Sequence, residues 1–438
     1  PVVTRRAFPT QNDSSGLRVP SKVPSNRPFC FVLSTLPDPM STHHEVLIVG
    51  GGTGGITVAS QLLSHESPPE VAILEPSDTH YYQPLWTLIG GGVFPKEESA
   101  RREADCIPHG ATWIQDAAAS FDPEHNSVTT ASGETITYDA LVMAMGIQID
   151  WDAIPGLAES VGKPGTGVVS NYDYDTCEAT WKTIQDFPKG GTAFFTEPTT
   201  GVKCGGAPQK IMYLADEAFR KQGVRDGSRI AFMKAKGKLF SSPKYEKTLY
   251  DVVGRKGIEL NLMTELIEIR PDEKTAVFRN LETGEETTET YDLLHAVPPM
   301  SAPDIIADSP LAADDGWVEV DPKTLQHTRF ANVFALGDNS NLPTSKTGAA
   351  IRKQAPVLVD HLVAELRHTQ PINGVYSGYT SCPLVTGYGK LVLAEFDYDK
   401  TPMESFPFDQ SQERYSMYAL KAYGLPRMYW NGMLKGRM

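Results

Sequence analysis

The chain has 438 residues, with 40 basic and 54 acidic side chains, a formal net charge of −14 and 40% hydrophobic residues. This composition predicts a folded protein of about two to three domains, and the acidic balance argues against nucleic acid, which requires a clustered basic surface. Five cysteines are too few for a secreted scaffold held together by disulfides, and the cysteine and histidine spacings predict no metal site.

The N-terminal residues 1–42 differ in composition from the rest of the chain. They are rich in Ser, Thr and Pro, contain no Glu, and hold five basic side chains against two acidic ones. Such a leader is typical of an organelle transit segment, and the alternative is a disordered tail. No apolar run in the sequence reaches the length of a membrane-spanning helix.

A dinucleotide-binding motif follows the leader. The apolar residues 45–49 predict a strand, residues 56–64 predict a helix, and the turn between them has the pattern G-x-G-x-x-G. A second predicted strand, 71–74, ends in Glu75, where a carboxylate can accept hydrogen bonds from an adenosine ribose. The residues expected to bind the cofactor here are Gly50, Gly52, Thr53, Gly54, Gly55 and Glu75.

Two later apolar segments also end in glycine. Residues 138–146 end in Gly146, and residues 332–338 end in Gly337 and Asp338, before a helix predicted from about Thr344. These segments resemble the two supporting motifs of the flavoprotein disulfide reductase superfamily. The resemblance assigns Asp338 to the ribityl chain of FAD and places Lys346 within reach of the flavin. The alternative is two ordinary core strands.

A cysteine stands where that superfamily has a second glycine-rich turn for NADH or NADPH. The predicted strand 192–196 leads into residues 197–208, which lack G-x-G-x-x-G and contain Cys204. Pro208 is suited to the first position of a helix predicted over 209–221, so Cys204 precedes a positive helix end, with Lys203 and Lys210 nearby. This setting favours the thiolate.

The C-terminal residues 412–438 combine basic and aromatic side chains at helical spacing. Gly424 and Pro426 are expected to divide them into two short helices. The pattern predicts helices that lie in a membrane interface. The alternative is a helical pair that packs on the protein's own core or on another subunit.

Longer stretches carry a more specific resemblance. Residues 202–213 around Cys204, 379–388 around Cys382, 81–86 and 341–347 resemble the mitochondrial type of the sulfide:quinone oxidoreductase family, and the similarity extends from about His44 to the C-terminus. The resemblance implies a Cys204–Cys382 disulfide or trisulfide beside a non-covalent FAD, with Lys210 as an electrostatic helper. It also implies flavin contacts from Gln83 and Ala118.

The same resemblance implies a reaction. Hydrogen sulfide attacks the sulfur bridge at Cys382 and frees Cys204 as a thiolate. The sulfane sulfur passes to glutathione, sulfite or cyanide, and two electrons pass through FAD to ubiquinone. Cys30, Cys106 and Cys177 are interpreted as bystanders. Hydrophobic candidates for a quinone channel are Trp86, Phe406, Phe408 and Tyr418.

The predicted fold class is α/β, with two interleaved Rossmann-like dinucleotide-binding domains and a C-terminal region with amphipathic, membrane-associating helices. Residues 43–150 and 290–370 are expected to form the FAD domain, residues 151–289 the second domain with Cys204, and residues 371–438 the C-terminal region with Cys382. The expected location is the mitochondrial inner membrane, bound at its surface. The sequence is compatible with a homodimer without specifying one.

Three other functions stay open on the sequence alone. A type II NADH:quinone oxidoreductase would share the FAD fold and the membrane tail. A sulfide dehydrogenase would pass its electrons to a cytochrome. A flavoprotein that serves only as a binding partner would not be reduced by sulfide.

Overall fold

The structure is a computed structural model that describes residues 42–372 and 374–438. The predicted leader, residues 1–42, lies outside the described residues except for Thr42, which begins the first strand. Cys30 lies outside them as well.

A seven-stranded sheet carries the first dinucleotide motif. Its strands run in the order β5 (Ala111–Ile114), β2 (Val71–Leu74), β1 (Thr42–Val49), β8 (Thr135–Met143), β7 (Ser127–Thr130) and β6 (Ala118–Asp122), and β19 (Val333–Ala335) also pairs with β8. The pairs β5–β2, β2–β1, β1–β8 and β8–β19 are parallel. Residues 46–49 are all buried, as expected for a parallel strand covered on both faces.

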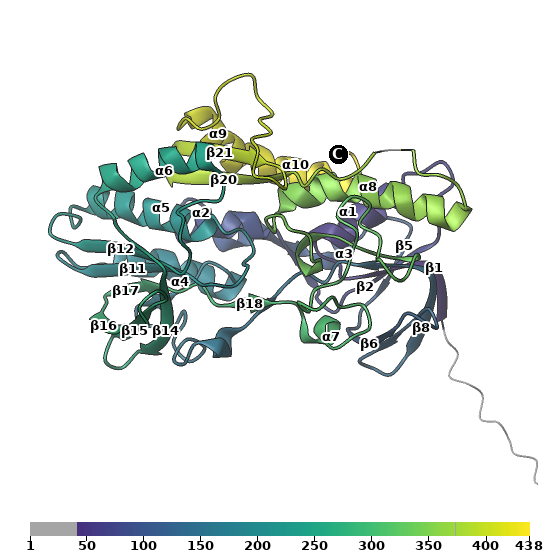
Figure 1. Cartoon of the computed structure of the whole chain (residues 1–438), viewed down its shortest axis with the longest axis horizontal. Coiled ribbons are helices and arrows are strands. Elements are labelled where there is room, and N and C mark those ends of the chain that lie inside the picture. The colour runs from purple at the N-terminus through teal and green to yellow at the C-terminus, as the bar shows by residue number, and fades with distance from the viewer. Residues whose placement is uncertain (1–41, 373) are drawn as a thin grey trace, which may run out of the picture. The chain divides into compact units, whose positions relative to one another are not determined.

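Two helices cover one face of this sheet. The helices α1 (Thr53–Leu62) and α8 (Gly348–Arg367) pack against each other above the strands, as Figure 1 shows. Both helices begin at the carboxyl edge of the sheet, where β1, β8 and β19 end. In an open α/β sheet this edge is where ligands bind.

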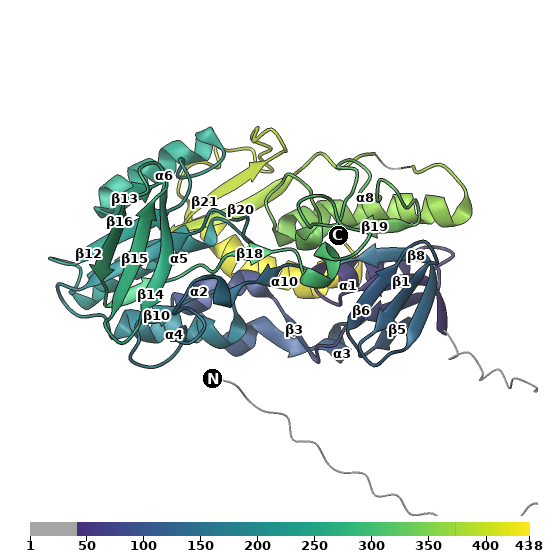
Figure 2. The same cartoon turned by 60° about the horizontal axis from the view of Figure 1, so that its bottom comes forward.

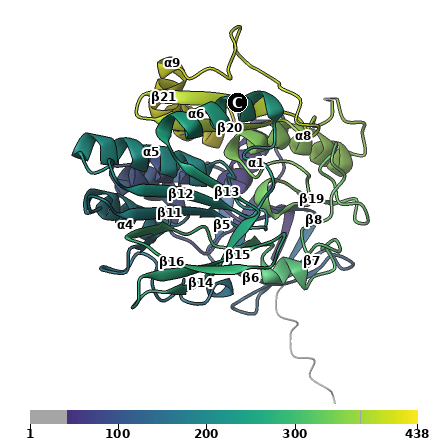
Figure 3. The same ribbon diagram turned by 60° about the vertical axis from the view of Figure 1, so that its left-hand side comes forward.

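The second sheet is entirely parallel. Its order is β10 (Val168–Val169), β17 (Leu293–His295), β11 (Thr192–Glu197), β12 (Arg229–Lys234) and β13 (Glu259–Leu262). Figure 3 shows α5 (Ala207–Gln222) and α6 (Pro243–Lys256) on one side, with the antiparallel strands β14 (Thr264–Arg270), β15 (Thr275–Asn280) and β16 (Glu286–Thr290) on the other. The helix α4 (Tyr174–Gln185) precedes β11.

The chain returns from the second sheet to the first later than the sequence predicts. The expected boundary lies between residues 289 and 290, but β17, which follows it, pairs with β10 and β11 of the second sheet. The crossing lies at the antiparallel pair β9 (Gln148–Ile149) and β18 (Met300–Ser301), through which the chain enters and leaves the second sheet. The apolar run of β17 is short, so the sequence pattern alone does not assign it to either sheet.

The remaining regular elements are short. Strands β3 (Thr79–Tyr81) and β4 (Ala100–Arg102) pair with each other. The other helices are α2 (Trp86–Gly90), α3 (Glu103–Cys106) and α7 (Asp304–Ala307), and short 3₁₀ turns cover Gln83–Leu85, Lys96–Ser99, Trp151–Ala153 and Gly337–Asn339.

The C-terminal region begins with a hairpin of β20 (Thr380–Gly387) and β21 (Lys390–Phe396). It ends with α9 (Tyr415–Ala419), a π-helical turn at Leu420–Gly424, α10 (Leu425–Asn431) and a 3₁₀ turn at Met433–Lys435. The two predicted short helices are present as α9 and α10, but the chain between them does not leave the helix, because a π-helical turn joins them. Gly424 falls in the wide π turn, and Pro426 falls in the first turn of α10, where its missing N–H is tolerated.

This helical segment packs on the protein's own core and lies between the two sheets in Figure 2. Its buried residues are Met417, Tyr418, Lys421, Ala422, Tyr429, Trp430, Met433 and Leu434, and its exposed residues include Tyr415, Tyr423, Arg427, Met428 and Lys435. One face is thus covered, as the alternative interpretation of the sequence anticipates, while the other faces solvent. Among the described residues, no helix is both long and apolar enough to cross a bilayer.

Candidate active site

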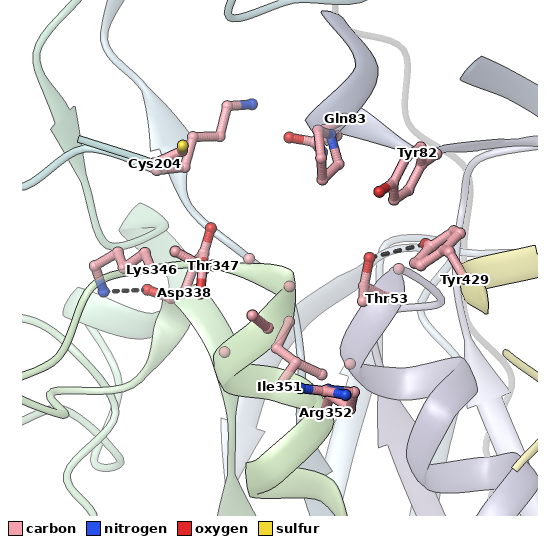
Figure 4. A pocket seen from close by; sticks show the side chains of 18 of the residues that line it. Thr53, Tyr82, Gln83, Cys204, Asp338, Lys346, Thr347, Ile351, Arg352 and Tyr429 are labelled. Atoms are coloured by element: carbon pink, nitrogen blue, oxygen red, sulfur yellow. Dashed lines mark hydrogen bonds between the residues drawn. The ribbon is translucent and has the colours of Figure 1, made fainter. Parts of the chain in front are cut away.

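A cavity of about 710 Å³ lies where the two sheets and the C-terminal segment meet. Figure 4 shows its walls, with Thr53 and Tyr429 on one side, Asp338 and Lys346 on another, and Cys204 and Gln83 at a third. The predicted cofactor residues that line it are Gly50, Gly52, Thr53, Gly54, Glu75, Gln83, Ala118, Gly146, Asp338 and Lys346. Cys204 and Lys210 line it too, whereas Gly55 and Cys382 lie just behind the wall.

The glycine-rich turn leaves room for a ligand at one position only. A Cβ at Gly50 would lie 2.4 Å from the carbonyl oxygen of Ala144, and a Cβ at Gly55 would lie 1.9 Å from that of Gly50. A Cβ at Gly52 would meet nothing within 4 Å. Gly50 therefore packs the turn against the segment that follows β8, and Gly55 packs α1 against β1 and the turn. Gly52 faces the open cavity, which fits the close approach of a pyrophosphate.

Glu75 stands at the end of β2, as the sequence predicts. Its carboxylate accepts hydrogen bonds from the backbone N–H groups of Gly51 and Ser77, both at 2.7 Å. Burial raises the pKa of Glu75, while the two N–H groups act in the opposite direction. The Glu75 carboxylate and the open space beside Gly52 together fit the ADP half of a dinucleotide.

Asp338 and Lys346 lie on the opposite wall (Figure 4). Burial raises the pKa of Asp338. The Lys346 ammonium donates to the carbonyl oxygens of Asp338 and Ser340 and lies 3.5 Å from the centre of the Trp317 ring. Lys346 is therefore at the cavity, but its charge is directed to the backbone of the turn that carries Asp338.

The chain holds Cys204 in a conformation that is uncommon for a residue with a side chain. Its φ is +53°, and three residues later the helix α5 begins. The Cys204 N–H donates to the Lys346 carbonyl at 2.9 Å, and the Tyr172 hydroxyl donates to the Cys204 carbonyl at 3.2 Å. These two bonds fix the backbone that presents the sulfur.

Strand alternation explains how Cys382 reaches the same place. On the β20–β21 hairpin, the side chains that line the cavity are Tyr379, Ser381, Pro383, Leu393 and Glu395, all at odd positions. Cys382, Leu384, Val392, Ala394 and Phe396 point to the opposite face and pack in the core that includes α5. Since successive side chains of a strand alternate between faces, Cys382 faces Cys204 while its neighbours face the cavity.

The two sulfurs are in contact although 177 residues separate them in the chain. No disulfide joins Cys204 and Cys382 in this structure, and a hydrogen bond connects their side chains. Gly206 makes this possible, because a Cβ there would lie 2.4 Å from the Cys382 sulfur. The structure thus brings together the pair that the sequence resemblance implied.

The surroundings assign different protonation states to the two sulfurs. The hydrogen bond from Cys382 and the Lys210 ammonium, 3.0 Å from the sulfur, hold the pKa of Cys204 well below its usual range against the effect of burial. The hydrogen bond to Cys204 and burial raise the pKa of Cys382 well above its usual range. Cys204 is therefore the thiolate and Cys382 the thiol.

Sequence reasoning missed Lys421, which belongs to the C-terminal segment. Its ammonium is buried, donates to the carbonyl oxygen of Pro84 at 2.6 Å and lies close enough to favour ionisation of both cysteines. Burial and the Lys210 charge lower the pKa of Lys421 to about 7. No spacing in the sequence relates Lys421 to the cysteines. The basic composition of residues 412–438 instead suggested that Lys421 lies on the exposed face of the segment.

Other predicted residues divide between the cavity and the core. Of the four quinone-channel candidates, Trp86 and Phe406 line the cavity and Phe408 and Tyr418 do not. Cys106 and Cys177 are buried and do not line the cavity. Burial raises the pKa of Cys106 to about 11 and that of Cys177 to about 12. Within residues 42–372 and 374–438, no three His, Cys, Asp or Glu side chains are placed to hold a metal ion.

Comparisons with known proteins agree with this arrangement. Residues 44–177 match the pyridine nucleotide-disulphide oxidoreductase family. Mitochondrial sulfide:quinone oxidoreductase of Dictyostelium discoideum is 49% identical over 90% of this chain and 86% of its own, and the protein of the same name from Mus musculus is 48% identical over 90% and 87%.

A solved structure shares the fold. The sulfide:quinone oxidoreductase of the bacterium Aquifex aeolicus superposes with a TM-score of 0.73 at 20% identity, and the match covers 89% of this chain and 92% of that one. The family identified from the sequence motifs is confirmed by the curated relatives, which span nearly the whole chain. On this evidence the chain belongs to the sulfide:quinone oxidoreductase family.

Proposed function

We propose that this protein oxidises hydrogen sulfide and passes two electrons through FAD to a quinone. The observation that carries the proposal is the contact of Cys204 with both Cys382 and Lys210 beside a cavity suited to a dinucleotide. A thiolate, a partner thiol and an ammonium at one wall of such a cavity are the groups that two-electron sulfur chemistry requires.

Residues on three walls would hold FAD. Gly50, Gly52 and Thr53, at the start of α1, would receive the pyrophosphate, and Glu75 the adenosine ribose. Asp338 would bind the ribityl chain. The residues proposed for the ring end are Gln83, Ala118, Gly146 and Lys346. When bound, FAD supplies a two-electron carrier between the sulfur pair and the quinone.

The protonation states of the pair indicate which sulfur the substrate attacks. Hydrosulfide attacks the Cys382 sulfur of the oxidised bridge, a new S–S bond forms there, and the bond to Cys204 breaks with its electron pair on Cys204. The Lys210 ammonium favours Cys204 as the leaving thiolate, because a low-pKa thiol leaves faster. A nucleophile such as glutathione, sulfite or cyanide then removes the sulfane sulfur from Cys382.

The cavity also offers an apolar region for a quinone. Its lining there includes Pro383 and Leu393 of the hairpin, Phe406, and Leu420 and Leu425 of the C-terminal segment. We place the quinone against these residues, on the opposite face of the hairpin from Cys382.

The test is a titration of the purified FAD-bound protein under anaerobic conditions. We expect sulfide with sulfite to bleach the visible flavin absorbance within one turnover, NADH to leave it unchanged, and a short-tailed ubiquinone to restore it. Rapid bleaching by NADH would instead support a type II NADH:quinone oxidoreductase. Reoxidation by a cytochrome but not by the quinone would support a sulfide dehydrogenase, and no bleaching by sulfide would contradict the proposal.

Membrane attachment is the second part of the proposal, and we assign it to the exposed face of residues 415–435. Tyr415 is 70% exposed and Tyr423 52% exposed, and they lie with Arg427 and Lys435 on the face that the core does not cover. Aromatic and basic side chains on one face of a helix favour the interface of an anionic membrane. We infer peripheral binding to the mitochondrial inner membrane.

A double variant tests this surface. We expect Tyr415→Ser with Tyr423→Ser to lower binding to vesicles that contain anionic lipid by about tenfold or more, since two aromatic groups no longer enter the interface. Cosedimentation measures the binding. Tyr250→Ser, which removes a 42% exposed tyrosine from α6, serves as the matched control. Point variants are used because Leu420, Leu425 and Tyr429 line the cavity, so truncation would also open the cofactor site.

A further inference from the structure

Four lysines line the cavity, and they differ in what their ammonium groups contact. Lys210 donates to the Cys204 sulfur at 3.0 Å, Lys346 to the Ser340 carbonyl at 3.2 Å and Lys421 to the Pro84 carbonyl at 2.6 Å. Within the described part of the chain, the Lys203 ammonium has no hydrogen-bond acceptor. The ammonium nitrogen lies 5.1 Å from the centre of the Trp86 ring.

The backbone holds Lys203 in this place. Its N–H donates to the Met300 sulfur at 3.4 Å, and the next residue, Cys204, is fixed by the bond to Lys346. Lys203 itself lines the cavity, with Trp86 beside its ammonium.

The Lys203 side chain is partly buried at the cavity wall. Burial lowers the pKa of Lys203 to about 8, and only the charges of Asp338 and Asp173 act in the other direction. Near neutral pH the group is still mainly protonated. A positive charge that lines a cavity, and that no described residue pairs with by a hydrogen bond, is suited to a negatively charged or electron-rich ligand there.

We propose that the Lys203 ammonium is the electrostatic partner of the flavin ring system and raises its reduction potential by favouring the two-electron-reduced, more negative form. This inference rests on the proposed binding of FAD. It differs from the role of Lys210, which contacts the Cys204 sulfur, and from that of Lys346, which is bonded to the backbone. The Lys203 ammonium would thus favour electron transfer from the two cysteines to FAD, although it does not contact either cysteine.

The experiment measures the potential of the bound FAD by equilibration with a reference dye, without sulfide or quinone. We expect Lys203→Met and Lys203→Gln each to lower the equilibrium constant for reduction by at least tenfold, about 30 mV for a two-electron couple. Lys203→Arg, which keeps the charge, should stay within about threefold of the natural protein. Lys189→Met, which removes an exposed lysine that does not line the cavity, should have no effect.

Three results would overturn the inference. The first is an unchanged potential in both neutral variants with FAD bound. The second is an unchanged potential with a higher sulfide concentration for half-maximal bleaching, which would assign the charge to hydrosulfide. The third is loss of FAD from both neutral variants, which would assign it to holding the cofactor. Failure of sulfide to reduce the natural protein would contradict the proposed function and leave the dye measurement interpretable.

Discussion

Replacing either Cys204 or Cys382 by serine is expected to abolish the rapid bleaching of the flavin by sulfide while FAD stays bound. A serine oxygen forms no bridge with the remaining sulfur, so hydrosulfide loses the electrophile that it attacks. Loss of a nucleophile of this kind costs an enzyme several orders of magnitude, and we expect a fall of at least about 10³-fold in the rate of bleaching. Stopped-flow absorbance measures that rate.

The matched control is Cys177→Ser. Cys177 is fully buried and its thiol donates to the Tyr174 carbonyl, a bond that a hydroxyl can replace. We expect this variant to bleach at the rate of the natural protein. Cys382 does not line the cavity, so its replacement should leave FAD content unchanged. Bleaching at an unaltered rate in Cys204→Ser or Cys382→Ser would contradict the sulfur chemistry.

Replacing Lys210 by methionine is expected to have the second largest effect, a pH-dependent loss of reactivity at the Cys204 sulfur. The hydrogen bond from Cys382 and the ammonium of Lys210 keep the pKa of Cys204 low, so removing the ammonium raises that pKa. The thiolate then forms only at higher pH. When the pH is below the pKa of a thiol, each unit by which that pKa rises lowers the thiolate fraction about tenfold. We therefore expect the rate of alkylation at Cys204 to fall about 10- to 100-fold near neutral pH.

The sign of the dependence distinguishes this role from a general disturbance of the fold. The deficit of Lys210→Met should shrink as the pH rises toward the ordinary range of a thiol, about 8.5, because both proteins then hold the thiolate. The measurement is the pH dependence of alkylation at Cys204 in the reduced protein, followed by peptide mass spectrometry. Lys221→Met, on the exposed end of the same helix α5, is the control. A deficit that is equal at every pH would exclude an electrostatic role.

The sequence predicted much of this site because several of its parts are local. The turn from Gly50 to Gly55 joins a strand to a helix within six consecutive residues, so its pattern can be read from the sequence, although the contact that demands Gly50 comes from Ala144. Glu75 follows directly from the end of β2. A helix beginning near Pro208 also follows from local chemistry, and α5 begins at Ala207.

Other parts required contacts that no local pattern encodes. The sequence places Cys382 in an extended segment, but only the hairpin with β21 decides which face it points to, and only Gly206 leaves space for its sulfur beside Cys204. Lys421 looks like a residue of the basic outer face. The packing of the C-terminal segment turns it inward, to the carbonyl of Pro84.

The C-terminal segment shows the same distinction. Its composition indicated an amphipathic helix, and the structure confirms an apolar face, but that face covers the protein's own cavity. The sequence by itself determined the dinucleotide motif, the loss of the nicotinamide turn and the family, because these depend on residues close together in the chain. The tertiary structure alone decided that two distant sulfurs share one ammonium and that the Lys203 ammonium lines the cavity beside Trp86, because such contacts depend on which surfaces pack together.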